Sequence, residues 1–80
     1  MSSFTISFTF RGQSYVASIY QSGAQPNLYS VYFTDVELIF EFGSKVEYTH
    51  DGKLQLSKKA DQQIISLLTQ ALTEPIKNAA

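Results

Sequence analysis

The sequence predicts an α+β domain in which an antiparallel β-meander of four or five strands is followed by one amphipathic α-helix packed on one face of the sheet. Two observations lead to this prediction. In most of the first half of the chain, apolar and aromatic residues recur at every second position, as in half-buried strands. Toward the carboxy terminus they recur at helical spacing. Because the strands precede the helix, a sheet with a helix laid across it buries both apolar surfaces.

The length and composition indicate a single domain spanning residues 1–80. Of the 80 residues, 44% are hydrophobic and 14% aromatic, which is enough for an ordered core. Cysteine is absent, so neither a disulfide nor a cysteine metal site can support that core. Only 16% of the residues are charged, against roughly 25% in a typical domain. We therefore expect stability to come from packing or from association.

The first two predicted strands, residues 4–10 and 15–20, form a hairpin. Their apolar residues change from even to odd positions across the intervening segment. A two-residue loop at Gly12 and Gln13 accounts for the change, because glycine suits the first central position of a type II′ turn. This register pairs Phe10 with Tyr15, Phe8 with Ala17 and Ile6 with Ile19 on one face, and Thr9 with Val16, Ser7 with Ser18 and Thr5 with Tyr20 on the other.

The middle of the chain predicts further strands at residues 28–33 and 36–42. The inward-facing apolar residues change from odd to even positions between these two segments. Either a tight turn at Thr34 and Asp35 joins two strands, or a bulge bends one long strand. We favour the turn.

Asp51-Gly52 is a short-range turn signal in the segment that follows. The alternation around residues 46–49 is poorer than in the earlier strands. The sheet therefore has five strands if this segment pairs and four if it does not.

The predicted helix spans about residues 58–74. Ser57 is a suitable N-cap, and Pro75 is expected to end or kink the helix. The tail at residues 77–80 is expected to fray. One stripe of the helix is apolar and should face the sheet: Ala60, Ile64, Leu67, Leu68, Ala71 and Leu72.

The second face of the predicted sheet has an unusual composition. Residues 1–34 carry a single charge, Arg11. The side chains that point away from the helix are therefore hydroxyls, aromatic rings and aliphatic groups, where a solvated strand normally carries Lys or Glu. The candidate interface on this face consists of Thr5, Ser7, Thr9, Val16, Ser18, Tyr20 and Tyr32.

The residues provide no set from which we predict catalysis, and we expect no enzyme, cofactor or metal site. The single histidine, His50, has no neighbouring Cys or clustered acids and is expected to be an exposed turn residue. Glu37 and Glu41 lie four apart and would share a strand face, where paired carboxylates are usually solvated. Lys53, Lys58 and Lys59 are interpreted as solvated in the same way.

The composition favours a non-catalytic interaction module, most simply a homodimer that buries the uncharged face or a strand edge. Interface cores are enriched in aromatics and depleted of Lys, Glu and Asp. Another protein partner is the second possibility. The alternative function is binding of single-stranded nucleic acid or a small ligand by sheet tyrosines, with Tyr20 and Tyr32 as the first candidates and Tyr48 as the third. Nucleic acid is disfavoured because the net charge is −1 and no basic groove is evident.

The amino-terminal segment has neither the basic region nor the apolar run of a secretory signal. No segment approaches the roughly 18 apolar residues of a membrane span. The expected location is therefore the cytoplasm.

Overall fold

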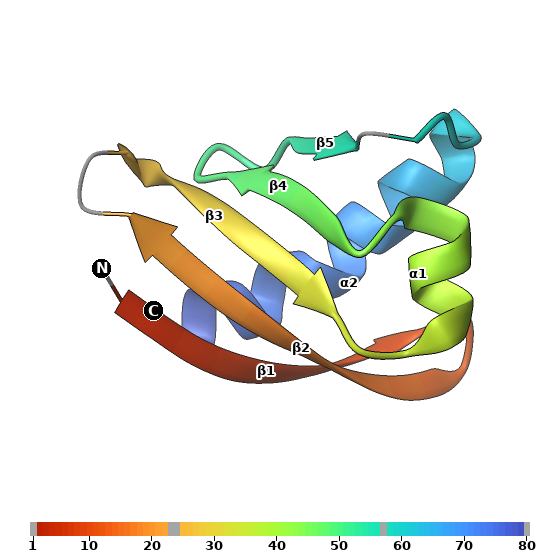
Figure 1. The fold of residues 1–80 in the computed structure, drawn as a ribbon, viewed down its shortest axis with the longest axis horizontal. Helices are drawn as coiled ribbons and strands as arrows, with labels where there is room; N and C mark the ends of the chain where they lie inside the picture. The colour runs from red at the N-terminus through yellow and green to blue at the C-terminus, as the bar shows by residue number, and fades with distance from the viewer. Residues whose placement is uncertain (1, 23–24, 57, 80) are drawn as a thin grey trace.

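A computed structural model describes residues 2–22, 25–56 and 58–79 and shows a five-stranded antiparallel sheet with a carboxy-terminal helix (Figure 1). The strands lie in the sheet in their chain order, β1-β2-β3-β4-β5. The predicted meander with a helix at its end is confirmed. The elements are β1 (Ser2–Phe10), β2 (Gln13–Ser22), β3 (Gln25–Phe33), α1 (Val36–Phe42), β4 (Lys45–Thr49), β5 (Leu54–Leu56) and α2 (Gln62–Ala79).

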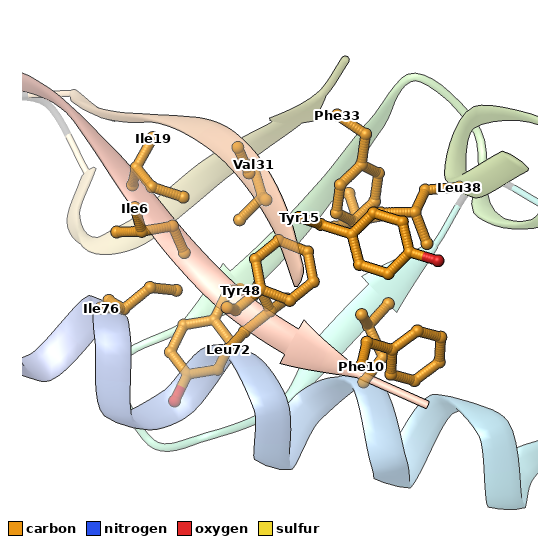
Figure 2. Packing of buried hydrophobic residues seen from close by; sticks show 14 of the residues in the cluster. Ile6, Phe10, Tyr15, Ile19, Val31, Phe33, Leu38, Tyr48, Leu72 and Ile76 are labelled. Atoms are coloured by element: carbon orange, nitrogen blue, oxygen red, sulfur yellow. The ribbon is translucent and has the colours of Figure 1, made fainter. Parts of the chain in front are cut away.

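The core lies between one face of the sheet and α2 (Figure 1). Leu68, Leu72 and Ile76 are buried along the helix, at successive i, i+4 positions. Figure 2 shows Ile76 of the helix beneath Ile6 of the sheet, and the ring of Tyr48 reaching the helix, so Tyr48 belongs to the core and not to the outer face. The Tyr48 hydroxyl, at the end of a buried ring, donates a 2.9 Å hydrogen bond to a helix threonine, Thr73. The alternating aromatic positions of β1 to β4 thus form the other half of this core, as the sequence predicted.

The hairpin turn consists of Arg11 and Gly12, so the predicted loop at Gly12 and Gln13 is wrong by one position. Both turn residues have positive φ, 51° and 79°, which is the geometry of a type I′ turn. Phe10 consequently pairs with Gln13. The other predicted pairs move with it: Phe8 pairs with Tyr15, Ile6 with Ala17, Ser7 with Val16 and Thr5 with Ser18. Each residue keeps its predicted face, because the partner changes by two positions.

Residues 36–42 form the helix α1, so both the predicted strand and the alternative of a bulged strand are wrong. The carboxylate of Asp35 caps the helix by accepting a 2.9 Å hydrogen bond from the Glu37 amide. Gly43, with φ of 94°, ends it by donating to the Ile39 carbonyl at 2.8 Å. The helix buries Leu38 and Phe42, which are four residues apart. Alternate positions are also two and four apart, which is why this segment imitates a strand.

The segment predicted at 46–49 is a strand, β4, and β5 follows the turn at Asp51-Gly52.

The last helix starts later and ends later than predicted. Asp61 caps it by accepting from the Gln63 amide at 2.8 Å, and the predicted cap, Ser57, lies outside the described residues. Pro75 is inside the helix, which continues to Ala79 instead of fraying from residue 77. The last turn stays helical because Ile76 is anchored in the core.

Candidate interaction surface

The face of the sheet opposite α2 brings together all the residues of the predicted interface. Strand pairing places Thr5 beside Ser18 and Ser18 beside Tyr32, which gives one row across β1, β2 and β3. A second row joins Ser7 to Val16. Ser18 is half-buried by its neighbours, and the other members are exposed. We call this uncharged surface the outer face and define it by Thr5, Ser7, Thr9, Val16, Ser18, Tyr20 and Tyr32.

The centre of the outer face is aromatic. The rings of Tyr20 and Tyr32 meet edge to face, with centroids 5.2 Å apart and planes at 90°. They are 41% and 39% exposed, and Val16 on the same face is 47% exposed. Large apolar groups therefore remain in solvent at the middle of a surface that is otherwise made of hydroxyls.

The uncharged region ends at β4. Lys45 lies beside Tyr32, and Glu47 lies beside Ser30, so the border carries one charge of each sign. At the other end of the sheet the charge of Arg11 is paired with Glu41 of α1. This contact raises the pKa of the Arg11 guanidinium, chiefly through the hydrogen bond to Glu41. The one charge of the amino-terminal strands is thus directed away from the outer face.

The free edge of β1 borders the outer face. Phe10 and Gln13 flank a two-residue turn and therefore form a hydrogen-bonded pair. Hydrogen-bonded pairs recur at every second position of an antiparallel ladder, so alternate residues of β1 that precede Phe10 also direct their N–H and C=O groups at β2. The remaining residues of the strand direct their N–H and C=O groups away from β2. These residues are Ser3, Thr5, Ser7 and Thr9, and all four are exposed.

The helix α2 runs beside this edge without filling the space next to it. A groove of about 380 Å³ lies between the strand, at Ser7 and Thr9, and the helix, at Gln70 and Glu74. A second groove, of about 320 Å³, continues past Thr9 to Leu67. Leu67 was predicted to face the sheet, but it is 51% exposed at this border.

His50 and the pair Glu37 and Glu41 lie on different elements. His50 is exposed in the turn after β4, as predicted. Glu37 and Glu41 are four apart on a helix and not on a strand, and Glu41 is engaged with Arg11. Among the residues that the structure describes, no group of three or more His, Cys, Asp and Glu side chains could hold a metal ion.

The sequence pattern did not predict one pair of exposed apolar side chains. Val36 and Phe40, on the solvent side of α1, are 79% and 80% exposed although alternation placed them in the core. The ammonium of Lys58 lies 5.1 Å from the centre of the Phe40 ring and donates to the Phe40 carbonyl. The signal that could have revealed this helix is Asp35, a capping residue placed before the segment that Gly43 ends.

In the described part of the chain no helix combines the length and the apolar character needed to cross a membrane. Comparison with protein-family models, curated proteins and solved structures finds no match to this chain.

Proposed function

We propose that the protein is a non-catalytic interaction module that self-associates through the uncharged surface formed by the outer face and the adjoining edge of β1. The observation that carries the proposal is that three consecutive strands direct no charge into solvent while exposing Val16, Tyr20 and Tyr32. A solvated antiparallel sheet face is normally polar, and the charged residues that make up roughly 25% of a typical domain lie mostly on such exposed surfaces.

The composition of this surface suits a protein interface. Interface cores are rich in aromatics and poor in Lys, Glu and Asp. A second copy is the simplest occupant, because a two-fold dimer needs only one self-complementary patch and this patch has no charge to repel its own copy. The opposite signs of Lys45 and Glu47 at the border add no net repulsion.

The proposal is tested by the molar mass of the protein, measured by light scattering over a dilution series. We expect the wild type to be a dimer that dissociates on dilution. Ser7→Lys places a charge where the outer face meets the edge and should leave a monomer, because lysine on an edge strand opposes strand pairing and the two copies would bring like charges together. Gln63→Lys adds the same charge on an exposed part of α2 and should leave the dimer intact.

Circular dichroism establishes that both variants fold. A wild type that is monomeric at every concentration would overturn the proposal. A Ser7→Lys protein that associates as strongly as Gln63→Lys would show that the contact lies elsewhere.

The second candidate is binding of single-stranded nucleic acid or a small ligand by the exposed tyrosines. The observation in its favour is the pair of accessible rings, since bases and other flat ligands stack on aromatic side chains. The two rings are perpendicular, however, so one flat ligand cannot stack on both of them. The charges that border the face, Lys45 and Glu47, have opposite signs and do not form a basic groove. Tyrosine fluorescence during titration with a single-stranded oligonucleotide at low salt tests the nucleic-acid candidate, and an unchanged signal would exclude it. Thermal unfolding with a panel of metabolites tests the small-ligand candidate, and an unchanged melting temperature throughout the panel would count against it.

A further inference from the structure

We infer that the contact between two copies is the free edge of β1, with the two β1 strands paired antiparallel about a two-fold axis perpendicular to the sheet. The inference rests on the proposed self-association and specifies its geometry: the contact uses the edge part of the proposed surface and leaves Val16, Tyr20 and Tyr32 of the outer face in solvent. Two five-stranded sheets would then form one continuous antiparallel sheet.

The first support is the backbone of the strand. The turn at Arg11 and Gly12 fixes which residues bond to β2, and it leaves the N–H and C=O groups of Ser3, Thr5, Ser7 and Thr9 directed at the free edge. Within the described residues, no other part of the chain forms a backbone hydrogen bond with these groups. A row of unpaired groups of this kind is a template for another strand.

The second support is that β1 has none of the features by which proteins usually block an edge. Its nine residues, SSFTISFTF, contain neither Lys nor Pro, and the pairing with β2 runs through the strand without a bulge. The other edge of the sheet, β5, has three residues. The long edge is therefore the one suited to pairing.

The third support is that β1 is complementary to itself. Full overlap of two antiparallel copies centres the axis on Ile6 and opposes Thr5 to Ser7 of the partner subunit and Phe4 to Phe8 of the partner subunit. Over residues 3–9, hydroxyl-bearing residues then oppose hydroxyl-bearing residues on the outer face, and apolar residues oppose apolar residues on the inner face. No charge of the strand opposes its copy.

The helix beside the edge is compatible with this arrangement. The perpendicular two-fold axis keeps both α2 helices on the same face of the joined sheet. The groove of about 380 Å³ leaves space between β1 and the helix. The exposed Leu67 borders the adjoining groove, next to Thr9 of the strand edge. Glu74 is the charged group on this border of the helix, and it lies on the inner side of the joined strands.

The first experiment removes a single edge-directed amide. Ser7→Pro deletes the outward N–H of Ser7 while leaving the β1–β2 ladder in place, which is why proline is tolerated only on this side of an edge strand. Ser7→Ala keeps the amide and removes the hydroxyl. We expect the dimer dissociation constant to rise at least about tenfold for Ser7→Pro, because each subunit loses one backbone hydrogen bond to its partner. It should change less than about threefold for Ser7→Ala, which keeps that hydrogen bond.

The second experiment does not depend on the proline variant folding. The chain has no cysteine, so Thr5→Cys and Ser7→Cys proteins can be mixed, one carrying an affinity tag, and oxidised mildly. Opposed residues in such a pair lie about 5.5 Å apart between Cα atoms, within reach of a disulfide. We expect the mixed covalent dimer as the main product. Ser18→Cys is the control. In the joined sheet the Ser18 positions of the two subunits are separated by three strand spacings, about 14 Å, so their cysteines should not cross-link.

The outcomes separate this inference from the proposed function. A wild type that never dimerises overturns both. A dimer that is unaffected by Ser7→Pro, or that cross-links through Ser18→Cys and not through the mixed pair, leaves self-association standing and overturns the edge contact. Efficient cross-linking of the mixed pair, with Ser18→Cys unreactive, supports the edge contact.

Discussion

Arg11 occupies the first central position of the turn in the amino-terminal hairpin. Among the described residues it is the only non-glycine residue with positive φ, a conformation that costs an ordinary side chain about 1 kcal/mol or more. Its guanidinium lies 4.5 Å from the centre of the Phe10 ring and pairs with Glu41 of α1. These contacts offset part of the backbone cost and also tie the turn to the helix.

We predict that Arg11→Asn is more stable than Arg11→Ala by about 1 kcal/mol. Both substitutions delete the guanidinium and its contacts, so the comparison isolates the backbone. Asparagine tolerates positive φ and creates the Asn-Gly pair favoured in type I′ turns, whereas alanine does not. Urea unfolding measures the difference. Equal stabilities for the two variants would be inconsistent with the observed turn.

Thr49 connects the end of β4 to the turn that follows. Its hydroxyl donates to the carboxylate of Asp51 and accepts from the Lys53 amide at 3.1 Å. The pKa of Asp51 is lowered, first by the hydroxyl and then by the charge of Lys53. A carboxyl with a depressed pKa in the folded state stabilises the fold above its unfolded-state pKa, and this contribution is lost as the pH falls through the folded-state value.

We therefore predict that Thr49→Val raises the pKa of Asp51 toward its ordinary value, while Thr49→Ser keeps it low. Valine retains the branched shape that suits a strand but has no proton to donate. Titration of the Asp51 carboxyl carbon by NMR provides the measurement. If the Asp51 titration curve is the same in Thr49→Val as in the wild type, the hydroxyl is not the cause of the shift.

The helix α2 contributes one side of the core through a narrow stripe. Leu68, Leu72 and Ile76 are buried, while the neighbouring Leu67 faces the groove beside β1. The sequence pattern puts Leu67 and Leu68 in the same apolar stripe. Neighbouring residues lie about 100° apart around a helix, which is also about the width of such a stripe, so the pattern admits both of them. The contact with the sheet, and not periodicity alone, decides between them.

We predict that Leu68→Ala lowers the free energy of unfolding by about 2 to 5 kcal/mol, because it leaves a cavity in a core position that is fully buried. Leu67→Ala makes the same chemical change at a half-exposed position and should cost less than about 1 kcal/mol in the monomer. Thermal or urea unfolding measures both losses, at protein concentrations below the dimer dissociation constant. Similar losses for the two would place the helix in a different orientation.

At the scale of the domain, the alternation of the strands and the helical spacing near the carboxy terminus were enough to predict the sheet, its covering helix and the outer face. The faces of β1, β2 and β3 follow from odd and even positions, and a shift of register by two cannot move a residue to the other face. Two features were not predictable in this way. Gly12 can occupy either central position of a primed turn, and Leu38 and Phe42 satisfy both the strand and the helix period. The sequence likewise shows which surface is uncharged, and in the part of the chain that the structure describes no segment covers it.

The two edges of the sheet differ in length, and this limits how large an assembly can grow. If two copies join through β1, the outer edges of the joined sheet are both β5, with three residues each. Strands this short offer too few backbone groups to recruit another copy. The same sheet order that leaves one long edge open would therefore end assembly at two subunits, and a pair of edges of equal length would instead have permitted an open-ended fibre.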